Sequence, residues 1–359
     1  MGQVTTTKRE RFEAEHPGAF FLDERDLPGL ERRLVRLGWL EPGEAVQSAV
    51  KPGDGNMNYT LRVTTSKCSL IVKQARPWVE KYDYIVAPAE RAVVEGRFYE
   101  LAAQYPELRD RMPRLIGMDA ESRLLGLEDL GTGADFTFLY RGATLAPAEA
   151  DELVTFLAAL HREFHGFQDD GLFTNRAMRE LNHLHIFRVP LDPENGLDLD
   201  AVTPGLSLAA AKLQADPAYV AAVAALGDVY LRDGGSLAHG DFFPGSWLQT
   251  PDGPHVIDPE FCFLGPPEFD LGVMVGHLHL AGQSGTLLDR VLARYDAERG
   301  IRPSDESRNL VSRFAGAEIM RRLIGVAQLP LAADLARKEV LLARSQALIL
   351  APAATSLSS

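Results

Sequence analysis

The chain has 359 residues, of which 46% are hydrophobic and 24% charged, and its formal net charge at pH 7 is -13. This length and composition fit two domains with apolar cores and exclude a collagen-like or disordered chain. The acidic balance argues against nucleic-acid binding, which usually needs a basic surface. We expect no membrane span, because no apolar run reaches about eighteen residues. The N-terminus lacks a signal-peptide core, so a cytoplasmic location is expected.

The first third of the chain alternates between strand and helix patterns. Residues 1–22 are polar and weakly patterned, and we expect a mobile or loosely docked segment there. Residues 23–130 are predicted to form a strand-rich lobe, closed by Gly131-Thr132-Gly133. Apolar periodicity predicts helices over 27–40 and 89–104, and strands over 58–64, 68–72 and 123–130.

The remainder, residues 131–359, is predicted to be mostly helical. Periodic apolar positions indicate helices over 147–164, 174–187, 217–231, 287–299, 305–327 and 331–350. The expected fold class is therefore α+β, with a small strand-rich lobe, a larger helical lobe and the chemistry at their junction. Cys68 and Cys262 each lie in an apolar run, which is typical of small core residues.

The most informative motif joins His239-Gly240-Asp241 to Asp258-Pro259-Glu260. A lone Asp in a Gly-containing loop suits a base that accepts the proton of an attacking hydroxyl, while Asp258 and Glu260, two apart on an extended segment, suit Mg²⁺. His239 is expected to support the loop backbone. This order of carboxylates indicates phosphoryl transfer.

Three further features fit nucleotide binding, and each also has a plain structural explanation. Lys73 ends an apolar strand and can pair with Glu95 of the next helix, with Glu90 as the fallback partner. The loop Gly53-Asp54-Gly55-Asn56 can bring backbone N–H groups to phosphates, although by itself it is more typical of a hairpin turn. The strand end that includes Glu128 and Leu130 offers backbone groups to an adenine.

A pair of arginines, Arg321-Arg322, lies in an apolar helical stretch near the C-terminus. Two adjacent arginines on such a helix cannot both face water easily, so at least one is expected to meet an acid or an anion. A structural ion pair and a binding role fit this pattern equally well.

Together these segments resemble the 5-methylthioribose kinases, in the aminoglycoside-phosphotransferase-like branch of the protein-kinase fold. The resemblance covers roughly residues 45–330, and its quoted motifs are Gly53 to Asn58, Val72-Lys73-Gln74-Ala75, Arg91 to Glu95, Leu127-Glu128-Asp129-Leu130, His239-Gly240-Asp241, Gly245-Ser246, Ile257 to Phe261, and Arg321-Arg322. The Gly-Ser pair, where most aminoglycoside and choline kinases have Asn in place of Ser246, and the Asp-Pro-Glu triplet are shared with the methylthioribose kinases.

The resemblance implies a two-lobed kinase-like fold, with a small antiparallel sheet, and phosphorylation of a sugar-like substrate by ATP with Mg²⁺. Asp241 would be the base, Asp258 and Glu260 the metal ligands, and Arg321 and Arg322 substrate contacts. Nucleotide contacts would come from Gly55, Asn56, Lys73, Glu95, Glu128, Leu130 and Ser246. A homodimer is also suggested.

Two departures from that family concern the acceptor. Phe242-Phe243-Pro244 stands where the family usually has Leu-His-Thr, and Trp78 comes earlier than the family's pocket tryptophan. The alternatives are therefore a kinase for another sugar, an aminoglycoside or an amino alcohol, and a nucleotide-binding protein without catalysis. Protein-kinase activity is disfavoured, because no Asp-Phe-Gly or Ala-Pro-Glu segment is found.

Overall fold

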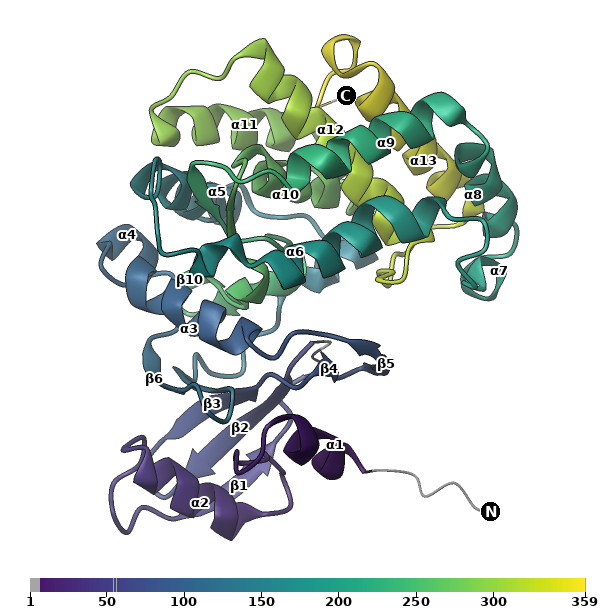
Figure 1. Cartoon of the computed structure of the whole chain (residues 1–359). Helices are drawn as coiled ribbons and strands as arrows, with labels where there is room; N and C mark the ends of the chain where they lie inside the picture. The colour runs from purple at the N-terminus through teal and green to yellow at the C-terminus, as the bar shows by residue number, and fades with distance from the viewer. Residues whose placement is uncertain (1–6, 54, 56, 359) are drawn as a thin grey trace, which may run out of the picture. The chain divides into compact units, whose positions relative to one another are not determined.

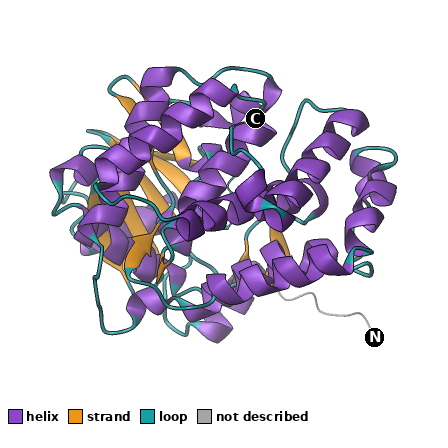
Figure 2. Ribbon diagram, turned by 90° about the horizontal axis from the view of Figure 1, so that it is seen from above, coloured by secondary structure: helices purple, strands orange, loops and turns teal. Residues whose placement is uncertain are grey.

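The computed structural model describes residues 7–53, 55 and 57–358. The chain divides into two compact units, of which the first ends at Gly131 and the second begins at Thr132. A five-stranded antiparallel sheet dominates the N-terminal unit, whereas the C-terminal unit is mostly helical (Figures 1 and 2). This is the predicted α+β class. No helix in the described part of the chain is long and apolar enough to cross a membrane.

The N-terminal unit is built on the strand order β1-β2-β3-β7-β6, with a separate β4–β5 hairpin. Its elements are α1 (Lys8–Glu15), α2 (Leu27–Arg36), β1 (Val46–Val50), β2 (Tyr59–Thr65), β3 (Ser69–Gln74), β4 (Trp78–Val79), β5 (Tyr82–Val86), α3 (Arg91–Ala102), α4 (Pro106–Arg109), β6 (Leu115–Asp119) and β7 (Leu124–Glu128).

Apolar alternation explains how this sheet is buried. Every second residue of β2 is buried, as expected for a strand with one face on the core. Leu30 and Leu34 of α2 join the same core cluster as the buried β2 and β3 side chains. Trp39 lies over β6 and β7, where only glycine leaves room for its ring. A Cβ at Gly117 or Gly126 would come within 2.2 or 2.7 Å of the indole.

Two expectations for this unit are wrong. Residues 1–6 lie outside the described residues, but α1 follows them and Phe12 is fully buried against Phe21 and Trp78, so residues 8–22 are docked. Cys68 is exposed rather than in the core, and only Cys262 is buried. Cys68 falls in the turn between β2 and β3, where an apolar run in the sequence does not imply burial.

The C-terminal unit packs its helices around two short strand pairings, β8–β11 and β9–β10, which carry the loops described below. Its elements are α5 (Pro147–Glu163), α6 (Arg176–His183), α7 (Leu199–Val202), α8 (Leu206–Gln214), α9 (Pro217–Tyr230), β8 (Ser236–Ala238), β9 (Trp247–Thr250), β10 (Gly253–Val256), β11 (Phe263–Gly265), α10 (Glu268–Leu280), α11 (Gly285–Arg299), α12 (Asp305–Ile324) and α13 (Leu335–Leu350).

Helices α10 and α12 approach each other closely at two glycines of α10. A Cβ at Gly272 would lie 2.5 Å from the Cβ of Phe314, and one at Gly276 would lie 2.9 Å from the carbonyl oxygen of Ala315. Contacts this short do not occur in real structures, so both positions require glycine. The close approach brings the side chains beside Gly276 into reach of α12.

Candidate active site

The loop that carries Asp241 is held by a short antiparallel pairing of β8 with β11. Gly240 adopts φ +87°, and a Cβ there would lie 2.1 Å from the carbonyl oxygen of Phe261, so only glycine fits. His239 is fully buried and bridges the loop, because its Nδ1 accepts from the backbone N–H of Asp241 at 3.4 Å and its Nε2 donates to the carbonyl of Ile257 at 3.1 Å. Burial lowers the pKa of His239. The expectation that this histidine supports the backbone is confirmed.

A second support for the loop, Asp270 in the first turn of α10, escaped the sequence analysis. The fully buried carboxylate accepts from the backbone N–H of His239 at 2.6 Å and of Gly240 at 2.9 Å. His161 of α5 lies 3.2 Å from it and is itself 2.8 Å from the hydroxyl of Tyr295. An acid at the start of a long apolar run was the available signal, because an acid that is buried there needs partners.

Asp241 directs its carboxylate toward the predicted arginine pair. Its Oδ1 accepts from Nη2 of Arg321 at 3.1 Å and from Nη2 of Arg322 at 3.2 Å, and 21% of its side chain remains exposed. Both arginines therefore meet an acid, where the sequence predicted that at least one would. The arrangement places two guanidinium groups beside a partly accessible carboxylate.

Glu318, one helical turn before the arginines, completes this cluster and was not predicted. Its Oε2 accepts from Nε of Arg321 at 2.5 Å, and its Oε1 accepts from Nε of Arg322 at 2.8 Å. Burial disfavours the charged form, but the two guanidinium groups outweigh it and hold the pKa of Glu318 well below its usual value. An acid three and four residues before two arginines was a readable signal, since those positions share a helix face.

The predicted metal ligands lie in a turn and not, as expected, on an extended segment. Asp258 has φ +63° and ψ +50°, and Pro259–Phe261 form one 3-10 turn, so Asp258 and Glu260 do not share a face of an extended segment. A non-glycine residue in the left-handed region is strained, and such strain concentrates at functional sites. Asp258 is half-buried and Glu260 is buried.

Two carboxylates still suit Mg²⁺, which is usually held by one or two carboxylates together with waters and phosphate oxygens. Within the described residues, no group of three or more His, Cys, Asp or Glu side chains is arranged as a metal site. A complete protein cage is thus not formed there, whereas a site that takes phosphate oxygens as further ligands fits Asp258 and Glu260.

The residues after Asp241 serve the core more than an acceptor surface, which corrects the sequence expectation. Phe242 is fully buried and packs on Phe156, His239 and Trp247, and Pro244 is also buried. Ser246 is buried too, and its Oγ donates to the carbonyl of Asp241 at 2.8 Å.

Phe243 is the member of this segment that faces the site. Its ring is half-buried, and the guanidinium carbon of Arg322 lies 4.5 Å from the ring centre. The departure from the family's sequence therefore reaches the site through a single side chain.

In the N-terminal unit, the predicted partner of Lys73 is present. Lys73 lies on the central strand β3, and its Nζ is 2.6 Å from Oε1 of Glu95 on α3, with both side chains almost fully buried. Glu90, the fallback partner, instead pairs with Arg123 at 3.0 Å. Trp78 is fully buried and bonds to Glu80 at 3.1 Å, so it belongs to the core of this unit.

The predicted phosphate loop is only partly described. Asp54 and Asn56 lie outside the described residues, whereas Gly55 is exposed. The end of the loop is held by the buried Arg91 of α3, whose side chain donates to the carbonyl of Met57 at 3.0 Å and to Oδ1 of Asn58 at 2.9 Å. Arg91 thus ties the end of the loop to the helix that carries Glu95.

The adenine-binding expectation falls at the end of β7. The side chain of Glu128 is exposed, and its Oε2 accepts from the backbone N–H of Arg114 at 3.1 Å. Leu130, two residues further on, is half-buried. Glu128 therefore uses its carboxylate to join β7 to the start of β6.

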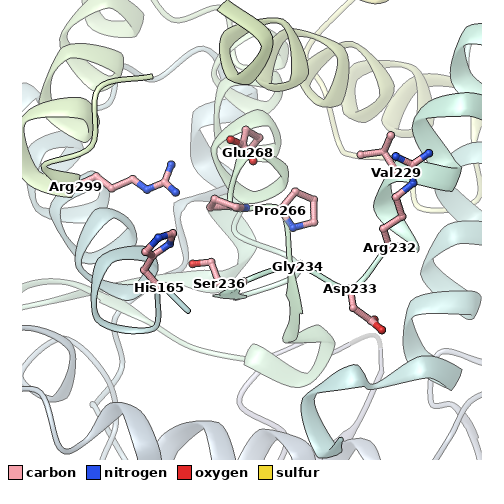
Figure 3. Close-up of a pocket in the computed structure, with 12 residues that line it drawn as sticks. His165, Val229, Arg232, Asp233, Gly234, Ser236, Pro266, Glu268 and Arg299 are labelled. Carbon is pink, nitrogen blue, oxygen red and sulfur yellow. The ribbon is translucent and has the colours of Figure 1, made fainter. Parts of the chain in front are cut away.

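A cavity of about 210 Å³ lies elsewhere in the C-terminal unit (Figure 3). It is bordered by the residues before β8, the end of β11 and the start of α10, and none of the predicted site residues lines it. Its acids have partners, because Asp233 pairs with Arg179 at 2.7 Å and Glu268 accepts from Ser307 at 2.7 Å. We assign it no role in the chemistry described above.

Comparison with known proteins now places this geometry in a family. Residues 48–305 match the phosphotransferase enzyme family APH. Methylthioribose kinase of Bacillus cereus (strain G9842) is 26% identical over 335 residues, which span 83% of this chain and 84% of the relative. The protein of that name from strain ATCC 10987 is 27% identical over 338 residues, with the same coverage.

Solved structures show the same fold. Choline kinase from Cryptosporidium parvum Iowa II superposes with a TM-score of 0.54 at 14% identity, covering 94% of this chain and all of that one. LicA in complex with AMP gives a TM-score of 0.51 at 12% identity, covering 89% and 97% of the two chains. The fold and the site thus define a kinase-like protein, and the chain belongs to the APH phosphotransferase enzyme family. It is a small-molecule phosphotransferase.

Proposed function

We propose that this protein transfers the γ-phosphate of ATP to a hydroxyl of a sugar-like small molecule, with 5-methylthioribose as the leading acceptor. The observation that carries the proposal is the partly exposed Asp241 carboxylate held by both Arg321 and Arg322. The relatives named methylthioribose kinase, which match along most of their own length, support this acceptor.

Asp241 is proposed as the base that orients the acceptor hydroxyl and accepts its proton. A carboxylate needs only to lie within hydrogen-bond reach of that hydroxyl to act in this way. Arg321 and Arg322 lie beside the same oxygen and supply the positive charge that a phosphoryl group requires during transfer. The arginines are buried and paired, so they are already ordered before substrate binds.

Asp258 and Glu260 are proposed to hold Mg²⁺, and Ser246 to contribute next to the nucleotide. Mg²⁺, when bound, neutralises negative charge on the phosphates. The left-handed backbone at Asp258 fixes the position from which its side chain extends. The Ser246 hydroxyl donates a hydrogen bond to the backbone carbonyl of Asp241. These residues keep the predicted base and the predicted metal ligands in fixed positions on adjoining loops.

In the N-terminal unit, Lys73 is proposed to grip the ATP phosphates, with Glu95 holding its ammonium group in place. The short distance and deep burial of this pair support the assignment, because a buried lysine is costly unless its charge is used. Gly55 and Asn56 are proposed to cover the phosphates, and the backbone at Glu128 and Leu130 to hold the adenine.

The chief alternative is a kinase for aminoglycosides or amino alcohols. A cationic acceptor needs a net negative surface near the reacting hydroxyl, yet here the charges of Asp241 and Glu318 are balanced by Arg321 and Arg322. The half-buried Phe243 ring beside Arg322 adds an apolar surface. The site therefore favours a neutral acceptor.

The test is an ADP-release assay with MgATP and a panel of acceptors. We expect turnover with 5-methylthioribose, weaker turnover with other pentoses, and none above background with aminoglycosides or choline. Turnover of a cationic acceptor at a higher kcat/KM would overturn the neutral-acceptor assignment. A protein that binds ATP but phosphorylates nothing in the panel would favour the non-catalytic alternative.

A further inference from the structure

The arginine pair is fixed at two points, which suggests that its direction matters. Each guanidinium gives its Nε to Glu318 and one Nη2 to Asp241. A planar guanidinium held at two different nitrogens cannot rotate about its long axis without losing one bond. Nη1 of Arg322 also donates to the carbonyl of Ala327 at 3.4 Å. Glu318 thus helps to determine where the remaining N–H groups of both arginines point.

Glu318 is in turn held by a chain of two further side chains. Nε2 of His277 lies 2.7 Å from Oε1 of Glu318, and the hydroxyl of Tyr140 lies 2.6 Å from Nδ1 of the same ring. All three residues are buried. An ionised carboxylate can only accept, so the His277 Nε2 donates its proton, its Nδ1 accepts, and the Tyr140 hydroxyl donates.

The protonation states agree with this direction of donation. Burial lowers the pKa of His277 to about 4, so the ring is neutral near pH 7 and carries one proton. Burial likewise raises the pKa of Tyr140 well above its usual value, which keeps the phenol protonated. Every hydrogen bond in the chain therefore has one donor and one acceptor.

Packing fixes the chain in place. A Cβ at Gly276, next to His277, would lie 3.0 Å from the Cβ of Glu318, so α10 and α12 leave Glu318 no room to move toward α10. The Phe243 ring packs against two members of the cluster, with its centre 5.1 Å from that of the tilted His277 ring and 4.5 Å from the Arg322 guanidinium carbon.

We propose that Glu318, His277 and Tyr140 are positioning residues that aim Arg321 and Arg322 at the phosphoryl group, with Asp241 between the two arginines. The inference rests on the proposed function. Stability alone does not explain such a cluster, because buried charges often stabilise a fold less than apolar side chains of the same volume. A fixed direction for two charged groups at a reacting centre does explain it.

The experiment compares Glu318→Gln, Tyr140→Phe and Tyr219→Phe with the wild-type protein, using the acceptor that it turns over best. Glu318→Gln keeps the shape but loses the charge, and we expect kcat to fall about 30-fold, which corresponds to about 2 kcal/mol in the barrier. Tyr140→Phe removes one hydroxyl, and we expect a fall of about fivefold. The KM for ATP is expected to stay within about twofold in both variants.

Tyr219→Phe is the matched control. Tyr219 of α9 is also a buried tyrosine of this unit. Its hydroxyl lies 2.7 Å from that of Ser345 on α13, away from Glu318 and His277. Loss of a buried hydroxyl there is expected to change the melting temperature about as much as Tyr140→Phe, with kcat unchanged. Equal losses of kcat in the two tyrosine variants, or wild-type kcat in folded Glu318→Gln, would overturn the positioning role.

A second readout does not depend on turnover. In ¹⁵N NMR spectra, the His277 ring, assigned by its loss in His277→Gln, is expected to show a proton on Nε2 only and no titration between pH 8 and 5.5. Tyr140→Phe is expected to shift the Nδ1 signal. A proton on Nδ1 in the wild type would rule out the proposed hydrogen bonds from Tyr140 to His277 and from His277 to Glu318, even if the enzyme is active. The expected spectrum in a protein without turnover would count against the proposed function alone.

Discussion

Asp241 holds a charge environment that is unusual for a proposed base, because both of its nearest charged neighbours are cations. A carboxylate held by two guanidinium groups keeps a fixed orientation. The same guanidinium groups are shared with Glu318, so they do not depend on Asp241 alone for a counter-charge. Removing the Asp241 charge should therefore affect the chemistry more than the fold.

Replacement of Asp241 by Asn tests this directly. General base catalysis contributes about 10² to 10⁴ in rate, so we expect phosphate transfer to fall by about that factor. ATP affinity, measured by calorimetry, is expected to remain within about twofold, because the predicted nucleotide contacts lie on other residues. Retention of full activity in this variant would remove Asp241 from its proposed role.

The residues that the sequence analysis missed share one property. Asp270 and Glu318 are buried acids, and each has a partner from a distant part of the chain, His161 for Asp270 and His277 for Glu318. Motif spacing identifies residues that act from one loop, such as Asp241. It does not identify side chains whose significance depends on tertiary packing.

At the scale of elements, the pairing of α10 with α12 connects the fold to the site. Gly272 and Gly276 allow the two helices to approach, and His277 then reaches Glu318. The sequence analysis predicted α12 but not α10, because α10 is apolar on nearly every face and shows no helical periodicity. By contrast, β2 and α5 were predicted to within a residue or two, since each alternates or repeats as a half-buried element does.

Gly276→Ala should disturb the arginine pair without touching it. The added methyl would meet the Cβ and Cγ of Glu318 at 3.0 and 3.3 Å, and overpacking of this kind costs about 1–3 kcal/mol. We expect lower stability in urea and a fall in kcat of about tenfold or more.

Gly272→Ala is the control for that change, because its methyl would meet Phe314 and the backbone of Val311 and Ala315 one turn away. Because its shortest contact is 2.5 Å, it should lower stability at least as much, while most of the activity of the folded protein remains. Equal losses of activity in both variants would show that activity depends on the distance between α10 and α12 and not on the position of Glu318.

At the scale of the whole molecule, buried histidines make stability depend on pH. Burial lowers the pKa of His277 and of His279 to about 4 from 6.5, and it also lowers that of His239. The unfolded chain therefore binds more protons than the folded chain between pH 6.5 and 4. The contribution of these groups is fully present above pH 6.5 and is lost as the pH falls through that interval.

We expect the free energy of unfolding to drop by about 2 kcal/mol between pH 7 and pH 5 from His277 alone. Urea unfolding followed by circular dichroism at the two pH values measures this drop. His277→Gln, which can still donate to Glu318, should show a shallower pH dependence. A wild-type midpoint that is the same at both pH values would contradict the burial of a neutral His277.

The sequence predicted side-chain contacts better in the N-terminal unit than it predicted the backbone of the C-terminal unit. In the N-terminal unit, Lys73 and Glu95 were paired correctly because a charged residue on a central strand requires a partner from the nearest helix. The turn at Asp258 was not foreseen, because a left-handed Asp leaves no pattern in the sequence. Local backbone geometry was thus the part that residue spacing could not supply.

The packing of the three tryptophans also provides an optical label for each unit. Trp39 and Trp78 lie in the N-terminal unit, whereas Trp247 lies in the C-terminal unit between the rings of Phe136 and Phe242, directly behind the Asp241 loop. A chain with Trp39 and Trp78 replaced by Phe would emit from Trp247 alone. Its fluorescence would report the melting of the C-terminal unit separately, and the complementary Trp247→Phe chain would report the N-terminal unit.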